Sequence, residues 1–361
     1  MDFRKYVRDS IDSNSSIIEF GPLNRPLFNK NEFSNIYYAD IRDTESIKKL
    51  YSGNEYLEKT GISVDINSIV NIDYVIKDTY KKTFKNKKFD VAYLSHVVEH
   101  MPDIIKFFDE ISDILKDDGK LILIYPDKRY CFDHYRNSAA FRDAYATYKY
   151  GIKENARLSF DFSYNVIKEN NAEKFWNNCG IINEISQEDL KIAEKYYIMN
   201  LNNKVIDDVH FWPFSDFDFL KFIYEMQRAK ILSFEIEEFF PTQENTQEFL
   251  VVLKKLNKEK VKSDKTQELI FKYDDLNVFI DLKKKEEESH DFINKTIIMN
   301  RCLIEKEQTI YELNQQKNLL EAEIAKLRVD LENINNCTSM KITKPLRLIK
   351  KFFLRGHEDE N

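Results

Sequence analysis

Residues 17–28 read IIEFGPLNRPLF, an apolar segment that ends in a single glycine followed by proline. A short apolar run before a turn residue is typical of a strand buried within a parallel sheet. Gly21 stands where a nucleotide-binding fold places a glycine-rich turn, yet the fuller pattern G-x-G-x-x-G is absent. Whether this is a ligand-binding turn or an ordinary turn after a strand depends on the rest of the sequence.

Six further segments have the composition of strands. The first five of the seven are short, apolar and separated by segments long enough for helices, which favours parallel strands buried on both faces. Only the polar turn PTQENTQ separates the last two, which can pair antiparallel. The sequence predicts an α/β fold with a Rossmann-like, mostly parallel sheet of seven strands and helices on both faces. The seven segments are 16–20, 35–41, 72–76, 89–95, 120–126, 231–239 and 248–254.

Two segments have the period of amphipathic helices. Residues 103–116 repeat apolar side chains at helical spacing, with Pro102 before them and Gly119 beyond them. Residues 215–229 form a second such segment, for which Ser215 is an N-cap candidate.

Composition and charge exclude several classes of protein. The chain has 361 residues and a formal net charge of -7, which argues against a general nucleic-acid binder. Its four cysteines are widely spread and form no C-x-x-C pair, so neither a zinc site nor a disulfide framework is predicted. The N-terminus lacks an apolar signal core, and no apolar run approaches the ~18 residues of a membrane span. We expect a cytoplasmic protein.

The chain changes character along its length, and we divide it into four parts. Residues 1–256 carry the strand and helix pattern, with an insertion at about 128–209 that is rich in Tyr, Phe and Asn and is predicted to cover the acceptor. Residues 257–289 are dominated by Lys and Glu, as in a solvated helix or a linker. Residues 290–336 carry a heptad seam, and residues 337–361 form a basic tail.

The heptad seam has spacings of four and three, which favour a left-handed coiled coil. About six heptads is long for a helix that packs on a domain surface, so we expect a homo-oligomer formed through this segment. A single helix packed on the domain is the alternative. The core positions of this seam, called its seats below, are Phe292, Thr296, Met299, Leu303, Lys306, Ile310, Leu313, Lys317, Leu320, Ile324, Leu327, Leu331 and Ile334.

Residues 339–356 read SMKITKPLRLIKKFFLRG and carry six basic side chains and no acid. Because apolar residues are interleaved with the basic ones, such a segment can lie on an anionic membrane or dock on a partner. We expect peripheral contact with the inner face of the membrane, and a merely soluble tail is an equal alternative.

Acidic side chains follow the early strands at the edge where an open parallel sheet binds ligands. Asp40 ends the second strand about 20 residues after the glycine turn, where an acid can accept hydrogen bonds from both ribose hydroxyls. Asp78 follows the third strand, where it can meet an adenine amino group or simply start a turn. No P-loop lysine follows Gly21, which argues against an NTPase.

Taken together, EFGP, the acid in YYADI, FDVAYLSHVVEHMPD and DDGKLILIYPD resemble a class I S-adenosylmethionine-dependent methyltransferase. The resemblance covers about residues 16–127, and the final strand pair extends it to about 255. The glycine loop departs from the usual G-x-G-x-G, because Pro22 and Asn24 replace later glycines. The resemblance implies S-adenosyl-L-methionine as cofactor. It assigns Glu19, Gly21, Pro22 and Asn24 to the methionine part, Asp40 to the ribose, Asp78 to the adenine, and Ser95 and His96 to the sulfonium region.

The tail carries a second, shorter resemblance. SMKITKPLR after a coiled coil is similar to an ending of bacterial surface-polysaccharide enzymes, with Met340 in place of a tryptophan. This resemblance implies a role in lipopolysaccharide or capsule assembly and a glycan or glycolipid acceptor.

Methyl transfer is an in-line displacement at an activated methyl group, so the protein mainly aligns the reactants. A sugar hydroxyl must also lose its proton, for which histidine is suited near neutral pH. We prefer His134, just beyond the fifth strand, as the base, and a structural loop network is its alternative. His96 and His210 are the other catalytic candidates.

Charged side chains around His134 predict how an acceptor is held. Arg129 or Arg136 would steer an anionic acceptor such as a phosphosugar or an acidic sugar, and Asp127 lies in the same loop. Trp212 would stack on a sugar face, and the alternative is that it packs in the core.

The order H-x-x-E-H at residues 96–100 can be matched to an inverted zinc motif. A metal would need more ligands, and the strand–helix pattern already explains the segment, so no metal site is predicted. We interpret His100 as a structural histidine near a helix start.

We predict an S-adenosylmethionine-dependent methyltransferase that O-methylates a sugar or phosphosugar in bacterial surface-polysaccharide biosynthesis. The alternative is a non-catalytic scaffold of the same fold that recruits a polysaccharide-assembly complex through its coiled coil. A nicotinamide-dependent enzyme would share the ribose-binding acid but calls for a fuller glycine loop.

Overall fold

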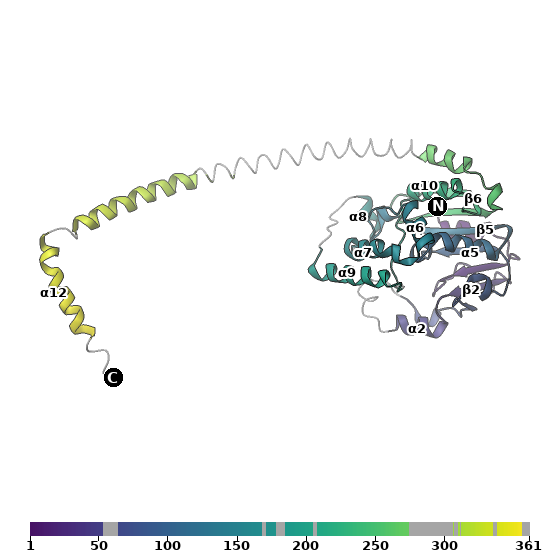
Figure 1. Ribbon diagram of the computed structural model, residues 1–361, viewed down its shortest axis with the longest axis horizontal. Helices are drawn as coiled ribbons and strands as arrows, with labels where there is room; N and C mark the ends of the chain where they lie inside the picture. The colour runs from purple at the N-terminus through teal and green to yellow at the C-terminus, as the bar shows by residue number, and fades with distance from the viewer. Residues whose placement is uncertain are drawn as a thin grey trace. The chain divides into compact units, whose positions relative to one another are not determined.

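The computed structural model describes residues 1–52, 64–167, 171–177, 185–204, 208–273, 306, 310, 312–334 and 338–355. The chain divides into two compact units, Met1–Asn277 and Val278–Asn361 (Figure 1). Among the described residues, no helix combines the length and the apolarity that crossing a bilayer requires.

The first unit is built on a seven-stranded sheet in the order β3-β2-β1-β4-β5-β7-β6. Strands β1 to β5 are parallel to one another, whereas β7 runs antiparallel between β5 and β6. The predicted mostly parallel sheet with a final antiparallel pair is confirmed. The strands are β1 Ile17–Phe20, β2 Ile36–Asp40, β3 Tyr74–Val75, β4 Phe89–Ser95, β5 Leu115–Pro126, β6 Phe234–Phe240 and β7 Glu248–Lys255.

Several α-helices begin where a side chain accepts a hydrogen bond from an amide of their first turn. Asp103 accepts a hydrogen bond from the amide of Lys106, and Ser215 accepts one from Asp218, so the two predicted helices start as expected. The α-helices are α1 Phe3–Ser10, α2 Thr44–Tyr51, α4 Tyr80–Thr83, α5 Ile104–Ile114, α6 Phe141–Tyr150, α7 Ala156–Asn165, α8 Ala172–Trp176, α9 Gln187–Leu201, α10 Asp216–Arg228 and α12 Thr338–Arg355. The 3-10 helices are η1 Ile66–Ser68, η2 Val98–His100, η3 Lys128–Tyr130, η4 Ile152–Asn155 and η5 Lys258–Lys260.

The two faces of the sheet are covered differently. One face packs against α4, α5 and α10, which bury a continuous apolar cluster with the inward side chains of the strands. The other face packs against Phe3 and Val7 of α1 and against Phe28 and Phe33. The latter two belong to residues 21–35, which connect β1 to β2 through turns and contain no helix. This loop therefore lies directly on the sheet beside the tip of β1.

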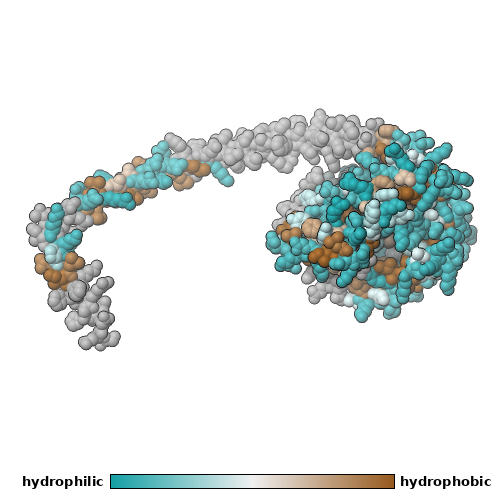
Figure 2. Space-filling model, viewed as in Figure 1, coloured by the Kyte–Doolittle hydropathy of each residue, from teal (hydrophilic) through white to brown (hydrophobic). Residues whose placement is uncertain are grey.

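Helices α6 to α9 form the insertion between β5 and α10, with α7 and α9 packed side by side (Figure 1). A cavity of about 440 Å³ lies against Phe160 of α7 and Ile198 of α9. Figure 2 shows apolar side chains exposed over this part, and Ile192, Ile198 and Leu201 are exposed members of α9. The insertion thus presents an apolar outer surface.

The charged segment after β7 begins as part of the first unit. Val261 and Thr266 are buried, and the helical residues 264–273 pack Leu269 and Tyr273 against the main core cluster. The remainder of the predicted linker, residues 274–289, lies outside the described residues.

The second unit is described for two helical stretches, 312–334 and α12. Seam residues Leu313, Leu320, Ile324, Leu327 and Leu331 are all exposed. The seats Phe292, Thr296, Met299 and Leu303 lie outside the described residues. The predicted basic segment is helical in α12, where Leu346 and Ile349 are exposed beside exposed Lys344 and Lys350.

Candidate active site

The tips of β1, β2 and β4 meet at Gly21. The amide of Gly21 donates to the carbonyl of Ala39 at 2.9 Å, which extends the pairing of β1 with β2 to the residue beside Asp40. Gly21 has a φ of +63°, in the left-handed region that favours glycine. A Cβ at this position would lie 3.1 Å from Cγ2 of Val97, in the loop after β4. The structure brings Gly21 and Asp40 together, and a side chain at position 21 would press on Val97 between the strand tips.

A cavity of about 580 Å³ opens beside these strand tips. Four of the residues that were assigned to a cofactor line it, namely Glu19, Gly21, Pro22 and Ser95. Its other lining residues are Arg4, Arg8, Phe20, Arg25, Pro26, Leu27, Asn29 and Tyr93. Asn24, Asp40, Asp78 and His96 are not part of the lining. The charged side chains that line the cavity are therefore one acid and three arginines, and the cavity lies at the carboxyl ends of β1 and β4.

Glu19 fixes the loop that follows β1. The alternation of β1 places Glu19 between Tyr38 and Tyr93 of the neighbouring strands. Its carboxylate accepts the amides of Leu27 at 2.8 Å and Phe28 at 3.1 Å. Burial raises the pKa of this carboxyl to about 7, although the two backbone hydrogen bonds act in the opposite direction. The side chain that was assigned to the methionine part of the cofactor thus also serves as the anchor of the helix-free loop.

The raised pKa of Glu19 predicts a pH dependence of stability. Because the folded-state pKa of about 7 lies above the ordinary value of 4.5, the carboxyl is more easily protonated in the folded chain. Its contribution is therefore fully present below about pH 4.5 and is lost as pH rises through about 7. We expect the wild type to lose free energy of unfolding between pH 5.5 and pH 8.5. Urea unfolding of Glu19→Gln over the same range should show a smaller pH slope, and equal slopes would contradict this assignment.

Asp40 and Asp78 occupy different environments. Asp40 is half-buried, and its Oδ1 accepts the amide of Arg42 at 2.9 Å. Burial, partly offset by that hydrogen bond, raises its pKa. Asp78 is exposed, accepts the amide of Thr79 and pairs with Lys82 at 3.0 Å. Of its two predicted roles, the structure shows the turn before α4.

His96 lies directly after β4 in a strained backbone conformation, with a φ of +54°. Its Nε2 is 2.8 Å from Oε2 of Glu248, the first residue of β7. Arg4 of α1 binds the same carboxylate and also donates to Oγ of Ser95 at 3.0 Å. Burial alone would raise the pKa of Glu248, but the bonds from His96 and Arg4 outweigh it and lower that pKa to about 2. A permanently ionised carboxylate thus orients a half-buried imidazole beside the cavity.

Arg4 and Glu248 were not predicted from the sequence. The sequence places Glu248 at the start of the last predicted strand, but only the structure shows that this strand pairs with β5 and brings Glu248 opposite Pro126, at the ligand-binding edge. The sequence offers no comparable signal for Arg4, which reaches the site from a helix that precedes β1.

His134 lies in a separate environment from His96. Its Nδ1 is 2.5 Å from the carbonyl oxygen of Arg129, and its ring packs against Phe175 of α8. The ring is half-buried in the insertion. These contacts correspond to the structural loop network that was the alternative for this residue.

The predicted acceptor-binding role of Asp127 does not fit its position. Asp127 is fully buried and forms an ion pair with Arg129. The Arg129 guanidinium also pairs with Asp216, at the start of α10, at 2.6 Å. Asp127 also forms a bridge with Phe214. Together these contacts fasten the beginning of the insertion to its end. Arg129 keeps a third of its side chain exposed, but its charge is balanced by two carboxylates.

The acceptor-binding roles that were predicted for Arg136 and Trp212 are likewise wrong, because both side chains have structural positions. The Arg136 side chain is 0% exposed and donates to Asp133, Asp161 and the carbonyl of His210. A guanidinium with these partners cannot steer an incoming acceptor. Trp212 is also fully buried and donates from Nε1 to the carbonyl of Met101, so it packs in the core as its alternative stated.

His210, the third catalytic candidate, is buried beside α10. Its Nδ1 is 2.6 Å from Oδ2 of Asp133, and this carboxylate raises the imidazole pKa against the effect of burial. Its Nε2 faces Glu99 at 3.9 Å. His210 is thus joined to the loop after β4 rather than to the cavity.

Comparison with known proteins gives one extended match in sequence. Residues 1–191 match the profile of a family described as methyltransferase domain. No curated protein is similar enough in sequence to count as a relative.

Solved structures resemble the chain at low identity. One, an S-adenosylmethionine-dependent methyltransferase from Methanosarcina mazei, has 13% identity and a TM-score of 0.33, with 71% of this chain and 99% of that chain covered. Another such enzyme, from Mesorhizobium loti, has 12% identity and a TM-score of 0.31, with 70% and 96% covered. The methyltransferase CalH, in complex with S-adenosylhomocysteine (SAH), has 10% identity and a TM-score of 0.34, with 70% and 55% covered.

Proposed function

We propose that this chain, which belongs to the methyltransferase domain family, O-methylates a sugar or phosphosugar in bacterial surface-polysaccharide biosynthesis. The family match over residues 1–191 covers more than half of the 361 residues, and the sheet is mostly parallel with an antiparallel seventh strand, as predicted. The chain is an S-adenosylmethionine-dependent methyltransferase. The acceptor and the roles of individual residues are the proposal.

The observation that carries the proposal is the meeting of three strand tips at Gly21. Its left-handed φ disfavours a side chain, and an added Cβ would lie only 3.1 Å from Cγ2 of Val97. A glycine at the carboxyl end of the first parallel strand lets the backbone approach a ligand closely, and Asp40 follows at the end of the adjacent strand. These residues fit an adenosyl cofactor without the fuller glycine pattern.

The charges of the cavity suit the amino-acid end of the methyl donor. That end carries one carboxylate and one ammonium group, and the cavity offers Arg4, Arg8 and Arg25 around Glu19. We assign the donor's carboxylate to these arginines and its ammonium to the side of Glu19. Asp40 would accept the ribose hydroxyls. S-adenosylmethionine supplies an activated methyl group, so the protein mainly has to orient the acceptor oxygen and remove its proton.

We assign the proton acceptor to His96 rather than to His134. His96 follows Ser95, which lines the cavity, and the Glu248 carboxylate holds its Nε2 at 2.8 Å. A histidine oriented by a carboxylate is a suitable general base near neutral pH. The other ring nitrogen, Nδ1, lies 3.8 Å from Oε1 of the buried Glu99. An imidazolium formed by taking the acceptor proton would therefore lie between two carboxylates, Glu248 and Glu99, and both would stabilise it.

The proposal of a glycan acceptor rests on the sequence of residues 339–347. SMKITKPLR after the heptad segment resembles the ending of surface-polysaccharide enzymes. A helix with exposed basic and apolar residues, α12, is also suited to an anionic membrane surface, where glycolipid intermediates reside. We therefore propose peripheral attachment at the inner face of the membrane.

Mass spectrometry of surface glycans tests the acceptor. Cells that lack this gene should lose one methyl group from a sugar of the surface polysaccharide, and the gene should restore it. Complementation with His96→Ala should fail to restore the methyl group, whereas His134→Ala should restore it. A glycan that is unchanged in the deleted strain would contradict the polysaccharide assignment.

The heptad segment is proposed to form a homo-oligomer. Leu320 and Leu327 lie on the seam and are more than half exposed, whereas Leu319 is exposed beside it. We expect Leu320→Lys combined with Leu327→Lys to convert the oligomer to monomers, because two buried charges would face one another across each seam layer. Leu319→Lys introduces the same chemistry off the seam and should leave the oligomer intact. Sedimentation velocity distinguishes these outcomes, and a monomeric wild type would contradict the proposal.

A further inference from the structure

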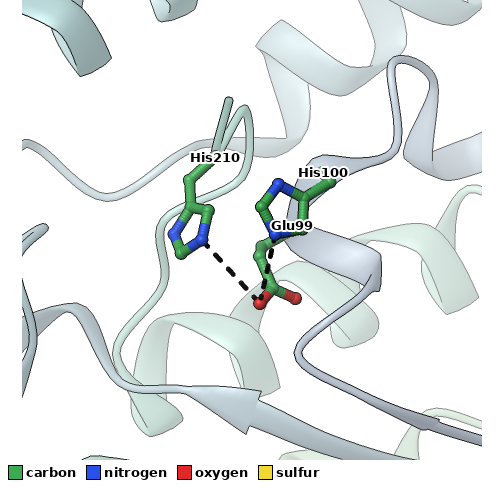
Figure 3. A group of neighbouring side chains, drawn as sticks. All are labelled: Glu99, His100 and His210. Carbon is green, nitrogen blue, oxygen red and sulfur yellow. Dashed lines mark ion pairs between the residues drawn. The ribbon is translucent and has the colours of Figure 1, made fainter. Parts of the chain in front are cut away.

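A second group of chemically active side chains lies behind the strand tips, around the carboxylate of Glu99. Glu99 and His100 belong to η2, directly after β4, and His210 comes from the end of the insertion. Figure 3 shows the two imidazole rings converging on the same carboxylate oxygen. Nε2 of His210 is 3.9 Å from Oε1 of Glu99, and Nε2 of His100 is 4.0 Å from the same atom.

The Glu99 carboxylate has no hydrogen-bond partner for either oxygen among the described residues. The side chain is 1% exposed, so it is withdrawn from bulk solvent. Burying a carboxylate without hydrogen bonds is strongly unfavourable, and buried charges are normally paired or bound to metals. The site therefore has an unmet demand for a positive ligand.

The orientation of His210 sharpens that demand. Its Nδ1 lies 2.6 Å from Asp133, an acceptor-only group when ionised, so Nδ1 carries the hydrogen. In the neutral ring, Nε2 then presents a lone pair toward the lone pairs of Glu99. A proton on Nε2 would not close the 3.9 Å separation to a hydrogen bond. A cation between the nitrogen and the oxygen satisfies both.

The surrounding contacts match those of a metal-binding histidine. Metal-ligating imidazoles usually donate their other N–H to a carboxylate, which fixes the ring and raises its basicity. The Asp133 carboxylate accepts the Nδ1–H of His210, and Arg136 donates a hydrogen bond of 2.7 Å to Asp133. The elaborate buried network around Arg136 thus ends at one imidazole that points at Glu99.

We propose that Glu99, His100 and His210 bind a divalent transition-metal cation of the zinc class. Two imidazoles and one carboxylate are a ligand set that zinc accepts, with a further position open to water or substrate. Tetrahedral zinc at bond lengths of ~2.1 Å separates its ligand atoms by roughly 3.4 Å. The two distances to Glu99, 3.9 and 4.0 Å, need a contraction of about half an ångström, and all three ligand atoms lie within 4.8 Å of one another. Hard cations such as Mg²⁺ prefer oxygen ligands and are not expected here.

The spacing of the sequence alone predicts no metal site, because H-x-x-E-H supplies too few ligands on a single segment. The ligand that completes the group, His210, is separated from His100 by the whole insertion. A cation at this position would join the end of the insertion to the loop after β4. This inference does not depend on the identity of the acceptor.

Metal binding by the full-length protein tests the proposal. The protein is stripped with chelator and titrated with Zn²⁺ or Co²⁺, and bound metal is measured by calorimetry, by elemental mass spectrometry and by the visible spectrum of Co²⁺. We expect about one equivalent to bind in a site with nitrogen and oxygen ligands. Glu99→Gln and His210→Ala should each weaken binding at least tenfold. His134→Ala, a half-buried histidine outside the group, should bind like the wild type.

Stability provides a second readout that does not depend on the binding assay. Zn²⁺ should raise the midpoint of thermal unfolding of the wild type, because it binds the folded state, and should not raise that of Glu99→Gln. In the absence of metal, Glu99→Gln should unfold at a higher temperature than the wild type, since it removes an unpaired buried charge. A stripped wild type that binds no Zn²⁺, or variants that bind as tightly as the wild type, would overturn the proposal.

Discussion

Replacing Gly21 by alanine is expected to weaken binding of SAH, the demethylated product of the methyl donor, by at least about tenfold, which corresponds to about 1.4 kcal/mol. The new Cβ would lie 3.1 Å from Cγ2 of Val97, so the chain at the strand tips that form the candidate cofactor site would have to shift. The left-handed φ of +63° also costs a residue with a side chain roughly 1–2 kcal/mol. The variant should therefore lose both stability and affinity. Calorimetry with SAH and urea unfolding measure the two effects.

Gly151 provides the matched control for this substitution. It also has a positive φ, +92°, at the end of α6, but a Cβ there would meet no described atom within 4 Å. Gly151→Ala should therefore show the backbone strain without the loss of affinity. Equal affinities of Gly21→Ala and the wild type would place the cofactor elsewhere.

Replacing Arg136 by methionine is expected to lower the free energy of unfolding by about 3–5 kcal/mol. The substitution keeps much of the side-chain volume but removes the charge that faces Asp133 and Asp161, and Asp133 is fully buried. Burial alone would raise the pKa of Asp133, but His210 and Arg136 together hold it well below its ordinary value, so the carboxylate stays ionised. Removing one partner leaves that charge uncompensated. Chemical denaturation gives the change directly.

Arg142→Met is the control for Arg136→Met. Arg142 is largely exposed and lies 4.0 Å from Asp143, so its loss should cost at most about 1 kcal/mol. The comparison also separates the two interpretations of Arg136. If Arg136 bound an anionic acceptor, its substitution would raise KM and leave stability unchanged, which is the opposite of the expected result.

The strands could be predicted because they are buried on both faces. Such strands are short continuous apolar runs, and IIEF and FDVAYLS show this directly in the sequence. The position of the candidate cofactor site then follows from topology, since parallel strands bring their carboxyl ends to one edge. Residues at those ends, such as Gly21 and Asp40, can be placed together without knowledge of side-chain packing.

The helix-free connection from β1 to β2 departs from the doubly wound pattern, although a signal for it was present. Pro22 and Pro26 both fall within residues 21–35, and proline removes a helical hydrogen bond. The anchor that replaces the helix, Glu19 bound to two loop amides, depends on tertiary contacts and could not be predicted.

The roles of charged and aromatic residues in the insertion could not be predicted, because burial decides them. Arg136 and Trp212 have the composition of a ligand site, yet both are fully buried. Their partners, including His210 and Met101, are far away in the sequence. A loop that is crowded with charges indicates a network, but only the three-dimensional contacts separate a structural network from a binding surface.

The most direct test of the cofactor site is calorimetric titration of SAH into the wild type and into Asp40→Asn. Asp40 ends β2 beside Gly21, so the wild type should bind and Asp40→Asn should bind at least about tenfold more weakly. Asp90→Asn alters a carboxylate at the amino-terminal end of β4, the end of the strand away from Gly21, and should bind like the wild type. No binding by the folded wild type, or equal binding by Asp40→Asn, would contradict a cofactor site at these strand tips.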